Sequence, residues 1–525
     1  MVEFTDALSK CSNCSLELLH LGYNKLGGFL PDSLGHLKNL KHLLLMGNSF
    51  SGSIPESIGN LSSLEVFYLS ENGMKGTIPV SLGQLSSLVA LDLKNNQWEG
   101  TITEAHLSNL TSLKELVPNA IKFSPQATVF LNNNHFTGPL PVLSSNVISY
   151  HFDHNFFSGP IPEDIGEQMP MLTDVDLSFN SLNGTIPLSM GKLNSLLTLV
   201  LSNNHLTGKI PDFWNNIPDV YVIDMWNNSL SGEIPTSLCS ISASLNYLTL
   251  SNNNLYGEIP SALRNCTDIY ILDLGDNKLS GEIPAWLGEM ASSLLILGLR
   301  SNMFYGKIPS DICKLSSLHI LDLAINNLSG SIPSCLGNLS SMASDVEYRY
   351  EGQLYVATKG AEYLYTETLY LVNSIDLSSN NLSGEVPDLR NLSRLSTLNI
   401  SMNHLTGKIP ESIGSLQRLE TLDLCKNQLS GQIPLSLTSL TFLSHLNLSY
   451  NNLSGEIPST NQFQSLNDPS IYQGNPALCG SPLSNKCRET SQSPGAGGEK
   501  RDNEDGDNLE KPLFYSSIGL GFVEL

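Results

Sequence analysis

The sequence comprises 525 residues with a formal net charge of -23, and 40% of its residues are hydrophobic. The excess of Asp and Glu argues against nucleic acid and anionic lipid as main partners, because both are bound by basic surfaces. The length exceeds what one globular core usually supports, so the chain must hold several domains or grow by repetition.

One phrase recurs along the chain, and residues 377–387, LSSNNLSGEVP, are a clear copy. Each copy carries LxxLxLxxN followed by LxGxIP, and most copies follow the previous one after 23 to 25 residues. This motif at this period is the signature of leucine-rich repeats, and the LxGxIPxxLGxL extension resembles their plant-specific subclass. The marker asparagines are Asn24, Asn48, Asn72, Asn96, Asn155, Asn180, Asn204, Asn228, Asn253, Asn277, Asn302, Asn326, Asn380, Asn403, Asn427 and Asn451.

Each copy predicts one coil of a solenoid. In the short strand at residues 43–45, Leu43 and Leu45 are expected to point inward and Leu44 outward. The marker Asn is expected to bond backbone groups of adjacent coils, as a structural ladder and not as a row of ligands. The Pro of the Ile-Pro step favours an irregular or helical-turn return path over a second full sheet. The predicted fold is an α/β-type repeat solenoid of about seventeen coils, a plant-specific leucine-rich-repeat superhelix with a parallel strand ribbon on its concave face.

The first block of repeats covers residues 1–342. It begins with neither a signal peptide nor a capping module, so we expect the N-terminal cap to be missing. Cys11 and Cys14 form CxxC without a second pair, and a buried thiol at Cys11 is favoured over a zinc site. The phrase degrades at residues 104–126, where we expect an irregular loop or a distorted coil.

An insertion interrupts the series, because 54 residues separate Asn326 from Asn380. It is assigned to residues 343–371, which are rich in Tyr and charge. Insertions in repeat proteins leave the solenoid at one edge and often carry function. Residues 354–356 and 363–365 alternate in polarity, which predicts short strands packed on the ribbon.

Four regular coils follow at residues 372–458, and residues 459–487 resemble the C-terminal cysteine cap of plant leucine-rich-repeat ectodomains. Residues 488–512 form an acidic linker that is too polar to fold alone. Residues 513–525 are apolar but shorter than a membrane helix, and we interpret them as the start of a truncated transmembrane segment.

The insertion, the four coils after it, the cysteine cap and the acidic-then-apolar end together resemble plant leucine-rich-repeat receptor-like proteins. The resemblance implies a plasma-membrane, single-pass type I parent protein that lacks a kinase and recognises microbial elicitors or endogenous peptides. It implies an adaptor receptor kinase at the acidic juxtamembrane segment and a coreceptor kinase at the post-insertion coils. A family motif of the insertion, called the island, matches Tyr350, Lys359 and Gly360, and the cap implies a disulfide between Cys479 and Cys487. The missing signal peptide, N-terminal cap and complete membrane helix depart from the family pattern.

Two further patterns bear on surface chemistry. Dense NxS/T sequences fit a secreted, glycosylated surface, with Asn60, Asn109, Asn183, Asn265, Asn338 and Asn391 as candidates. No enzyme constellation is present, so we predict no catalytic residue, no cofactor and no metal site. His151 and His154 are interpreted as surface residues, and the Asp at the centre of LxL, as in Asp176, as repeat filler in preference to a cation site.

Binding is predicted where strand slots carry large aromatic residues, which supply contact area at low entropic cost. Tyr221 and Tyr270 occupy the same slot two coils apart. The hypothesis is a patch for a peptide or small protein with basic and apolar groups, and the alternative is a set of unrelated surface aromatics. The patch comprises Tyr221, Asp224, Trp226, Tyr247, Tyr270, Asp273, Asp276 and Arg300.

The remaining cysteines are assigned by slot. Cys266 takes a core slot, whereas Cys313 and Cys335 lie on the return side of adjacent coils and are candidates for a disulfide.

The function that these patterns predict is the recognition of a peptide or protein ligand by a non-catalytic ectodomain in plant defence. One alternative is a soluble inhibitor of a secreted enzyme, similar to polygalacturonase-inhibiting proteins, although those are shorter and end at the cap. Another is a developmental peptide receptor. A truncated, nonfunctional gene product is a further alternative.

Overall fold

The leucines of the repeat phrase build the core of each coil. Leu43 and Leu45 are fully buried and Leu44 is half-buried, as the alternation predicts. In the parallel register Leu43 faces Leu19 of the preceding coil and Phe67 of the following one, so the apolar side chains stack from coil to coil. The computed structural model describes residues 15–107, 127–143, 145–239, 244–290, 293–343, 354–365, 368–459, 463 and 465–487.

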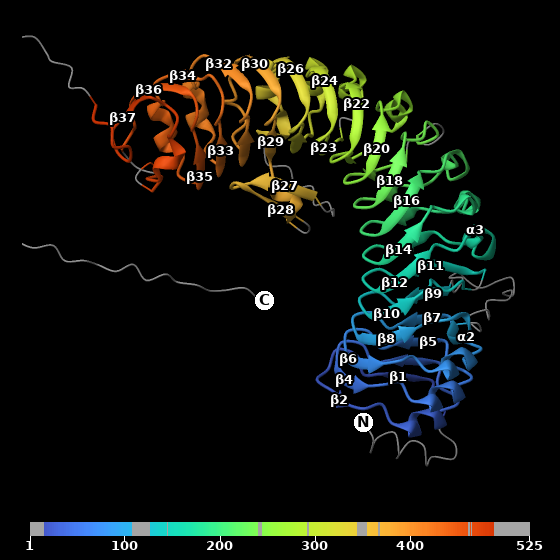
Figure 1. Ribbon diagram of the computed structural model, residues 1–525. Helices are drawn as coiled ribbons and strands as arrows, with labels where there is room; N and C mark the ends of the chain where they lie inside the picture. Colours follow the sequence, from blue (N-terminus) through green and yellow to red (C-terminus); the bar gives the residue numbers. More distant parts are fainter. Residues whose placement is uncertain are drawn as a thin grey trace, which may run out of the picture. The chain divides into compact units, whose positions relative to one another are not determined.

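The strands of successive coils pair in parallel into a 17-stranded sheet, here called the ribbon. Figure 1 shows the coils stacked in chain order. The ribbon strands are β1 (Leu18–His20), β3 (His42–Leu44), β5 (Val66–Tyr68), β7 (Ala90–Asp92), β9 (Ala127–Phe130), β11 (Val147–His151), β13 (Asp174–Asp176), β15 (Thr198–Val200), β17 (Val222–Asp224), β19 (Tyr247–Thr249), β21 (Ile271–Asp273), β23 (Ile296–Gly298), β25 (Ile320–Asp322), β29 (Ser374–Asp376), β31 (Thr397–Asn399), β33 (Thr421–Asp423) and β35 (His445–Asn447). The strand count agrees with the predicted seventeen coils, so the solenoid prediction is confirmed.

The return path differs from the prediction, because it contains a second sheet as well as helical turns. The residues just before each Ile-Pro step are extended, and Pro ends that strand instead of preventing it. Its 15 strands are β2 (Gly27–Gly28), β4 (Ser49–Gly52), β6 (Gly73–Gly76), β8 (Gln97–Thr101), β10 (His135–Gly138), β12 (Phe156–Pro160), β14 (Ser181–Gly184), β16 (His205–Lys209), β18 (Ser229–Gly232), β20 (Asn254–Gly257), β22 (Lys278–Glu282), β24 (Met303–Lys307), β26 (Asn327–Ser331), β30 (Asn381–Glu385) and β32 (His404–Thr406). The short strands β34 (Ser430–Gly431), β36 (Asn452–Glu456) and β37 (Ala477–Cys479) form a third sheet after it.

The predicted helical turns follow the prolines, mostly as short 3-10 helices. They are η1 (Asp32–His36), η2 (Glu56–Asn60), η3 (Val80–Gln84), η4 (Leu188–Lys192), η5 (Trp214–Asn216), η6 (Ser261–Asn265), η7 (Ala285–Glu289), η8 (Ser310–Lys314), η9 (Ser334–Asn338), η10 (Ser340–Met342), η11 (Leu369–Leu371), η12 (Glu411–Ser415), η13 (Leu435–Ser439) and η15 (Pro469–Ile471). Two turns are α-helical, α2 (Glu104–Leu107) and α3 (Ile165–Gln168). Across the described part of the chain, no helix has the length and apolar character needed to cross a bilayer.

The marker asparagines form the predicted ladder. The Asn204 amide donates to the carbonyl of Leu177 one coil earlier at 2.9 Å, and its oxygen accepts from the Leu182 amide at 2.9 Å. Equivalent bonds join Asn48 to Leu21 and Asn451 to Leu424. Since these side chains satisfy backbone groups that would otherwise be buried without partners, they are structural and not ligands.

The insertion supplies a hairpin that lies against the ribbon. β25 pairs directly with β29, so the inserted residues leave the stack without breaking it. Within them, β27 (Leu354–Thr358) and β28 (Ala361–Tyr365) pair antiparallel, which confirms the predicted strands. Residues from the ribbon and from the insertion share a second apolar core, made of Ile271, Leu295, Ile296, Ile320, Leu354, Val356, Leu369 and Val372.

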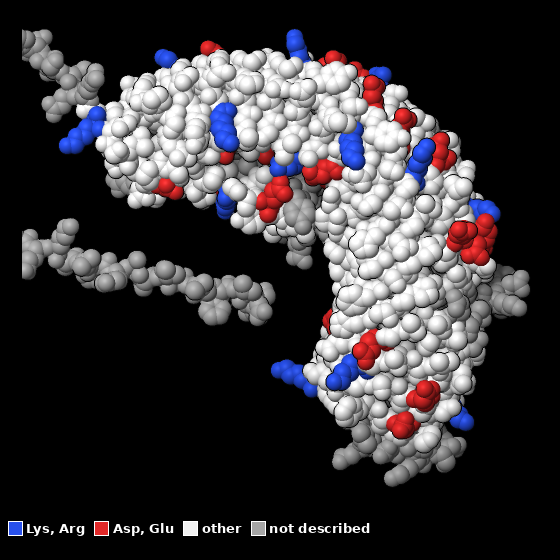
Figure 2. Space-filling model, viewed as in Figure 1, with Lys and Arg blue, Asp and Glu red and all other residues white. Residues whose placement is uncertain are grey.

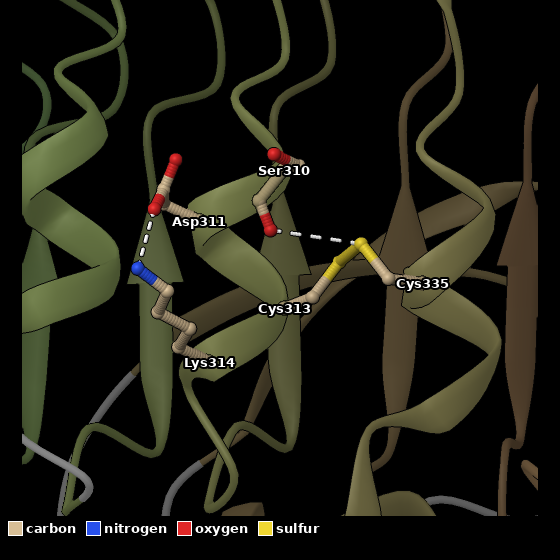
Figure 3. The surroundings of a disulfide bond; sticks show 5 residues. All are labelled: Ser310, Asp311, Cys313, Lys314 and Cys335. Atoms are coloured by element: carbon tan, nitrogen blue, oxygen red, sulfur yellow. Dashed lines mark hydrogen bonds and ion pairs between the residues drawn. A yellow bond between two sulfur atoms is a disulfide. The ribbon is translucent and has the colours of Figure 1, made fainter.

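Disulfides join neighbouring coils on the return side. Cys313 on η8 bonds to Cys335 on η9 with Cα atoms 5.8 Å apart, as predicted from their slots (Figure 3). Cys266 is buried as expected but bonds to Cys239, a pairing that the slot argument missed. Cys425 is free and buried. Cys479 and Cys487 are each disulfide-bonded, whereas the prediction for Cys11 lies outside the described residues.

Five of the six candidate glycosylation asparagines have exposed side chains: Asn60, Asn183, Asn265, Asn338 and Asn391. Asn109 and the segment 108–126 lie outside the described residues. Exposure makes these side chains accessible to modification, and their glycosylation stays a prediction.

Candidate functional site

A cavity of about 370 Å³ lies between the hairpin and the ribbon. Its volume is in the range of small-ligand and side-chain pockets. The hairpin contributes Leu354, Ala357, Glu362 and Leu364, and the ribbon contributes polar, charged and aromatic residues of six successive coils. Figure 1 shows the hairpin beside the ribbon, and Figure 2 shows side chains of both charges gathered at that place.

Four residues of the predicted patch line this cavity: Trp226, Asp273, Asp276 and Arg300. The ring of Trp226 therefore shares a wall with three charged groups. Asn227 and Asn252 lie beside it and are joined by a bond of 2.6 Å from the Asn252 amide to the Asn227 oxygen. The sequence predicts that strands of the insertion pack on the ribbon, but it does not predict that they cover these residues.

The other four patch residues surround the cavity or support it. Tyr221 and Tyr270 are 39% and 37% exposed, and backbone bonds through Asn246 place them in the same slot two coils apart, as predicted. Tyr247 packs against the apolar core under the hairpin, with its ring centroid 6.3 Å from that of Tyr270.

Asp224 is held by the coil itself. Its carboxylate accepts bonds from the Ser202 hydroxyl at 2.8 Å, the Thr249 hydroxyl at 2.6 Å and the Trp226 amide at 3.1 Å. Burial raises its pKa above the ordinary value, and these bonds oppose the rise. Asp224 therefore supports the strand and the position of Trp226.

The carboxyl group of Asp273 is buried, although Asp273 lies on the ribbon. It is 7% exposed and accepts bonds from the Ser251 hydroxyl at 2.5 Å and the Gly275 amide at 3.1 Å. Burial raises the pKa of Asp273 to about 6. The neighbouring coil has Gly298 in the facing slot, where a Cβ atom would lie only 2.5 Å from the Asp273 carboxylate oxygen. The glycine therefore leaves the room that this carboxyl needs.

This raised pKa predicts a pH dependence of stability. The folded state holds a proton on Asp273 between pH 3.8 and about 6, whereas the unfolded state has released it, so the stabilisation is present at low pH and is lost as pH rises through 6. Asp273→Asn should therefore become more stable relative to the parent by up to about 3 kcal/mol between pH 4 and pH 7. Urea unfolding of both proteins across this range measures it, and a difference that stays constant with pH would contradict the assignment.

Arg300 connects the hairpin to two ribbon strands. Its guanidinium lies 2.6 Å from Glu362 on the hairpin, 3.8 Å from Asp322 and 3.6 Å from Asp376. Burial alone would lower the pKa of Arg300, but the facing carboxylates outweigh it and raise that pKa above its ordinary value. Burial also raises the pKa of Asp322 well above its usual range, and repulsion from Asp376 adds to this.

The two described residues of the island motif form the turn of the hairpin. Lys359 and Gly360 have φ of 53° and 78°, and Thr358 pairs with Ala361, which is the geometry of a two-residue type I′ turn. Glycine suits this conformation, and a Cβ at Gly360 would also approach the His445 ring to 3.0 Å. Tyr350 lies outside the described residues.

The turn docks on the coils after the insertion. The Lys359 ammonium lies 2.9 Å from Glu420, and the Lys359 amide donates to the Thr421 hydroxyl at 3.0 Å. The Thr358 hydroxyl contacts those of Thr397 and Thr421 at 3.0 and 3.1 Å. The hairpin is thus held at its tip by the post-insertion coils and at its side by Arg300.

The parallel ribbon, the ladder and the repeat phrase define a leucine-rich-repeat protein of the plant ectodomain type. The family description "Leucine-rich repeat region" matches residues 5–133. "Leucine Rich Repeat" matches residues 171–193, 195–217, 220–241, 244–266, 268–290, 317–339, 394–416, 418–440 and 442–463. The chain belongs to the leucine-rich-repeat family, and its solenoid matches the ectodomains of plant receptor kinases. A comparison with curated protein sequences finds no match.

Solved structures of plant receptors give functional context. The Arabidopsis receptor kinase HAESA, in complex with the peptide hormone IDA and the co-receptor SERK1, is 33% identical over 90% of this chain and 76% of that chain, with a TM-score of 0.72. The ectodomain of GASSHO1/SCHENGEN3 from Arabidopsis thaliana, in complex with CASPARIAN STRIP INTEGRITY FACTOR 2, is 31% identical over 90% of this chain, with a TM-score of 0.71. This chain spans 56% of the length of the GASSHO1/SCHENGEN3 ectodomain. The plant peptide hormone receptor RGFR1, in complex with RGF2, is 28% identical over 87% of this chain and 70% of that chain, with a TM-score of 0.71.

Proposed function

We propose that this chain is the non-catalytic recognition module of a plant cell-surface receptor and that it binds a peptide or protein segment in the cavity between hairpin and ribbon. The observation that carries the proposal is the cavity itself, because it combines an aromatic wall with charged groups held in place by their own partners. Binding sites of this kind use a few fixed polar groups for orientation and apolar surface for affinity. HAESA was solved with a peptide hormone, and RGFR1, a peptide hormone receptor, was solved with RGF2, which supports the same mode of action here.

The charges of the cavity indicate the chemistry of the ligand. Asp273, Asp276, Asp322 and Glu362 provide four carboxyl groups around one guanidinium, that of Arg300. Since Arg300 already pairs with Asp322 and Glu362, the cavity offers carboxyl groups for a cation. A peptide with a Lys or Arg side chain next to an aromatic or aliphatic residue fits this lining.

The cellular role is proposed from the family resemblance. The parent protein would be a single-pass, kinase-lacking receptor-like protein of the plasma membrane that recognises a microbial elicitor in defence and signals through an adaptor receptor kinase and a coreceptor kinase. The hairpin insertion and the docked coils after it support this role over a soluble enzyme inhibitor. The peptide hormones bound by HAESA and RGFR1 favour a developmental peptide receptor as the second candidate.

A cavity-filling variant tests where the peptide binds. The full chain, produced through a secretory pathway, is used to select binders from a random library of displayed peptides of 8 to 12 residues, and we expect enrichment of Lys or Arg beside apolar residues. Ala357 lines the cavity, so Ala357→Trp should fill it and weaken the selected peptides more than tenfold, measured by biolayer interferometry.

The matched control lies on the same hairpin. Ala361 is exposed and lies outside the cavity lining, so Ala361→Trp should change affinity less than twofold. Equal affinity for the parent and Ala357→Trp would exclude the cavity as the binding site. Adding coreceptor kinase ectodomains to the peptide complex in size-exclusion chromatography then separates the candidate roles, because each role requires peptide-dependent co-elution with its own partner.

A further inference from the structure

Three potential metal ligands meet on the ribbon outside the cavity. His151 ends β11 and Asp176 ends β13, and the two residues face each other in the parallel register. Asp153 follows His151 by two residues, on the same coil. One donor atom from each of the three side chains lies within 4.8 Å of the others. This separation allows all three to bind one ion after small rotations of the side chains.

The carboxylates are held in position by other groups. Asp153 is 7% exposed, and its Oδ2 lies 3.0 Å from Nδ1 of His154. Oδ1 of Asp176 accepts bonds from the amide and the hydroxyl of Ser178, at 3.0 and 2.7 Å. Such supporting bonds orient the side chains that bind the ion in metal sites, and they leave the second oxygen of each carboxylate for an ion.

His151 supplies the nitrogen donor. Its ring packs on Phe130 with centroids 5.0 Å apart, and its ring nitrogens make no hydrogen bond with any described residue. Packing therefore fixes the plane of the ring while its nitrogens stay available to a ligand.

The same strand slot in other coils lacks this combination. Asp92 occupies the slot that corresponds to Asp176. Tyr68 faces it in the place of His151, and Ser70 donates a hydrogen bond to it from the place of Asp153. In that coil the carboxylate of Asp92 already has a hydrogen-bond donor in the hydroxyl of Ser70. At Asp176 the place of that hydroxyl is taken by the carboxyl group of Asp153, and the imidazole of His151 is added, so two carboxyl groups stand beside a nitrogen donor.

We propose that His151, Asp153 and Asp176 bind a divalent transition metal ion of the Zn²⁺ type. Imidazole nitrogen favours such ions over Ca²⁺ and Mg²⁺, which prefer all-oxygen sites. The ion bridges two coils, neutralises the facing carboxylates and keeps coordination positions for water on the ribbon face. This site is independent of the cavity, since none of its ligands lines it.

Zinc titration of the full chain tests the site. After treatment with a chelator and dialysis at pH 7, isothermal titration with ZnCl₂ should give one site per chain with micromolar affinity and a rise in the thermal midpoint. His151→Ala and Asp176→Asn should each weaken zinc binding more than tenfold, and CaCl₂ and MgCl₂ should bind more than tenfold more weakly than ZnCl₂.

Asp92→Asn is the matched control, because it removes a carboxylate from the same slot in a coil without the other two ligands, and it should leave the zinc isotherm unchanged. The thermal midpoint of each variant without metal shows that it is folded. Anomalous diffraction from a zinc-soaked crystal should place the ion between the three residues. The proposal is overturned if zinc fails to saturate one site, or if both variants fold and bind zinc like the parent.

Discussion

Replacing Arg300 with Met is expected to lower the free energy of unfolding by about 3–5 kcal/mol, because it leaves buried carboxylates without their cation. Arg300 is 19% exposed and Asp376 only 2%. At pH 7.5 the loss should be largest. Burial raises the pKa values of Asp322 and Asp376, so at lower pH these groups take up protons and the missing cation costs less. Urea unfolding at pH 5 and pH 7.5 measures both effects.

The control for this prediction removes the exposed partner instead. Glu362 is 53% exposed, so Glu362→Gln should cost less than about 1 kcal/mol. Amide hydrogen exchange at residues 354–365 should be faster in Arg300→Met than in Glu362→Gln. Arg300→Met removes the guanidinium that joins the hairpin to Asp322 and Asp376, whereas Glu362→Gln removes only one carboxylate. A loss in Arg300→Met no larger than in Glu362→Gln would show that Arg300 is not the connection that the distances indicate.

The repeat phrase predicts the main contacts that stay within its own period. Leu43, Leu45 and the ladder asparagines each meet the residue in the same or a neighbouring slot one coil away, so spacing alone identifies the partner. The ribbon, the ladder and the Cys313–Cys335 pair follow from this rule. The second sheet was missed because the argument considered only the Pro that ends each strand and not the extended residues before it.

Contacts between residues that are not one repeat apart could not be predicted in this way. Arg300 meets Glu362 across 62 residues, and Thr358 meets Thr421 across 63, because the hairpin folds back on coils to which the repeat spacing does not relate it. The aromatic and acidic patch was found from the residue types in equivalent strand positions. The hairpin that covers it was not predicted there, so the sequence predicted an open surface where the structure has a cavity. His151 and Asp176, by contrast, lie one repeat apart in the same slot, so spacing does place them together; they were missed because one was interpreted as a surface residue and the other as repeat filler.

Replacing Tyr221, Trp226 and Tyr270 together with Ala is expected to weaken the binding of selected peptides by well over tenfold. Aromatic side chains at the centre of an interface commonly carry most of its binding energy. Trp226 lines the cavity, whereas the two tyrosines lie beyond its lining, so Trp226→Ala alone should account for most of the loss. Affinities from isothermal titration with a peptide selected on the parent chain measure the single and triple variants.

Two exposed tyrosines of the second sheet serve as controls. Tyr256 on β20 and Tyr305 on β24 are 47% and 48% exposed, and both belong to the coils that build the cavity but lie outside its lining. Their replacement with Ala removes the same ring from the surface, so affinity should stay within twofold of the parent. If these controls weaken binding as much as Trp226→Ala, the peptide lies on the second sheet. If the triple variant folds and binds like the parent, the aromatic residues on the ribbon have no part in recognition, and the charged groups around Arg300 must carry it alone.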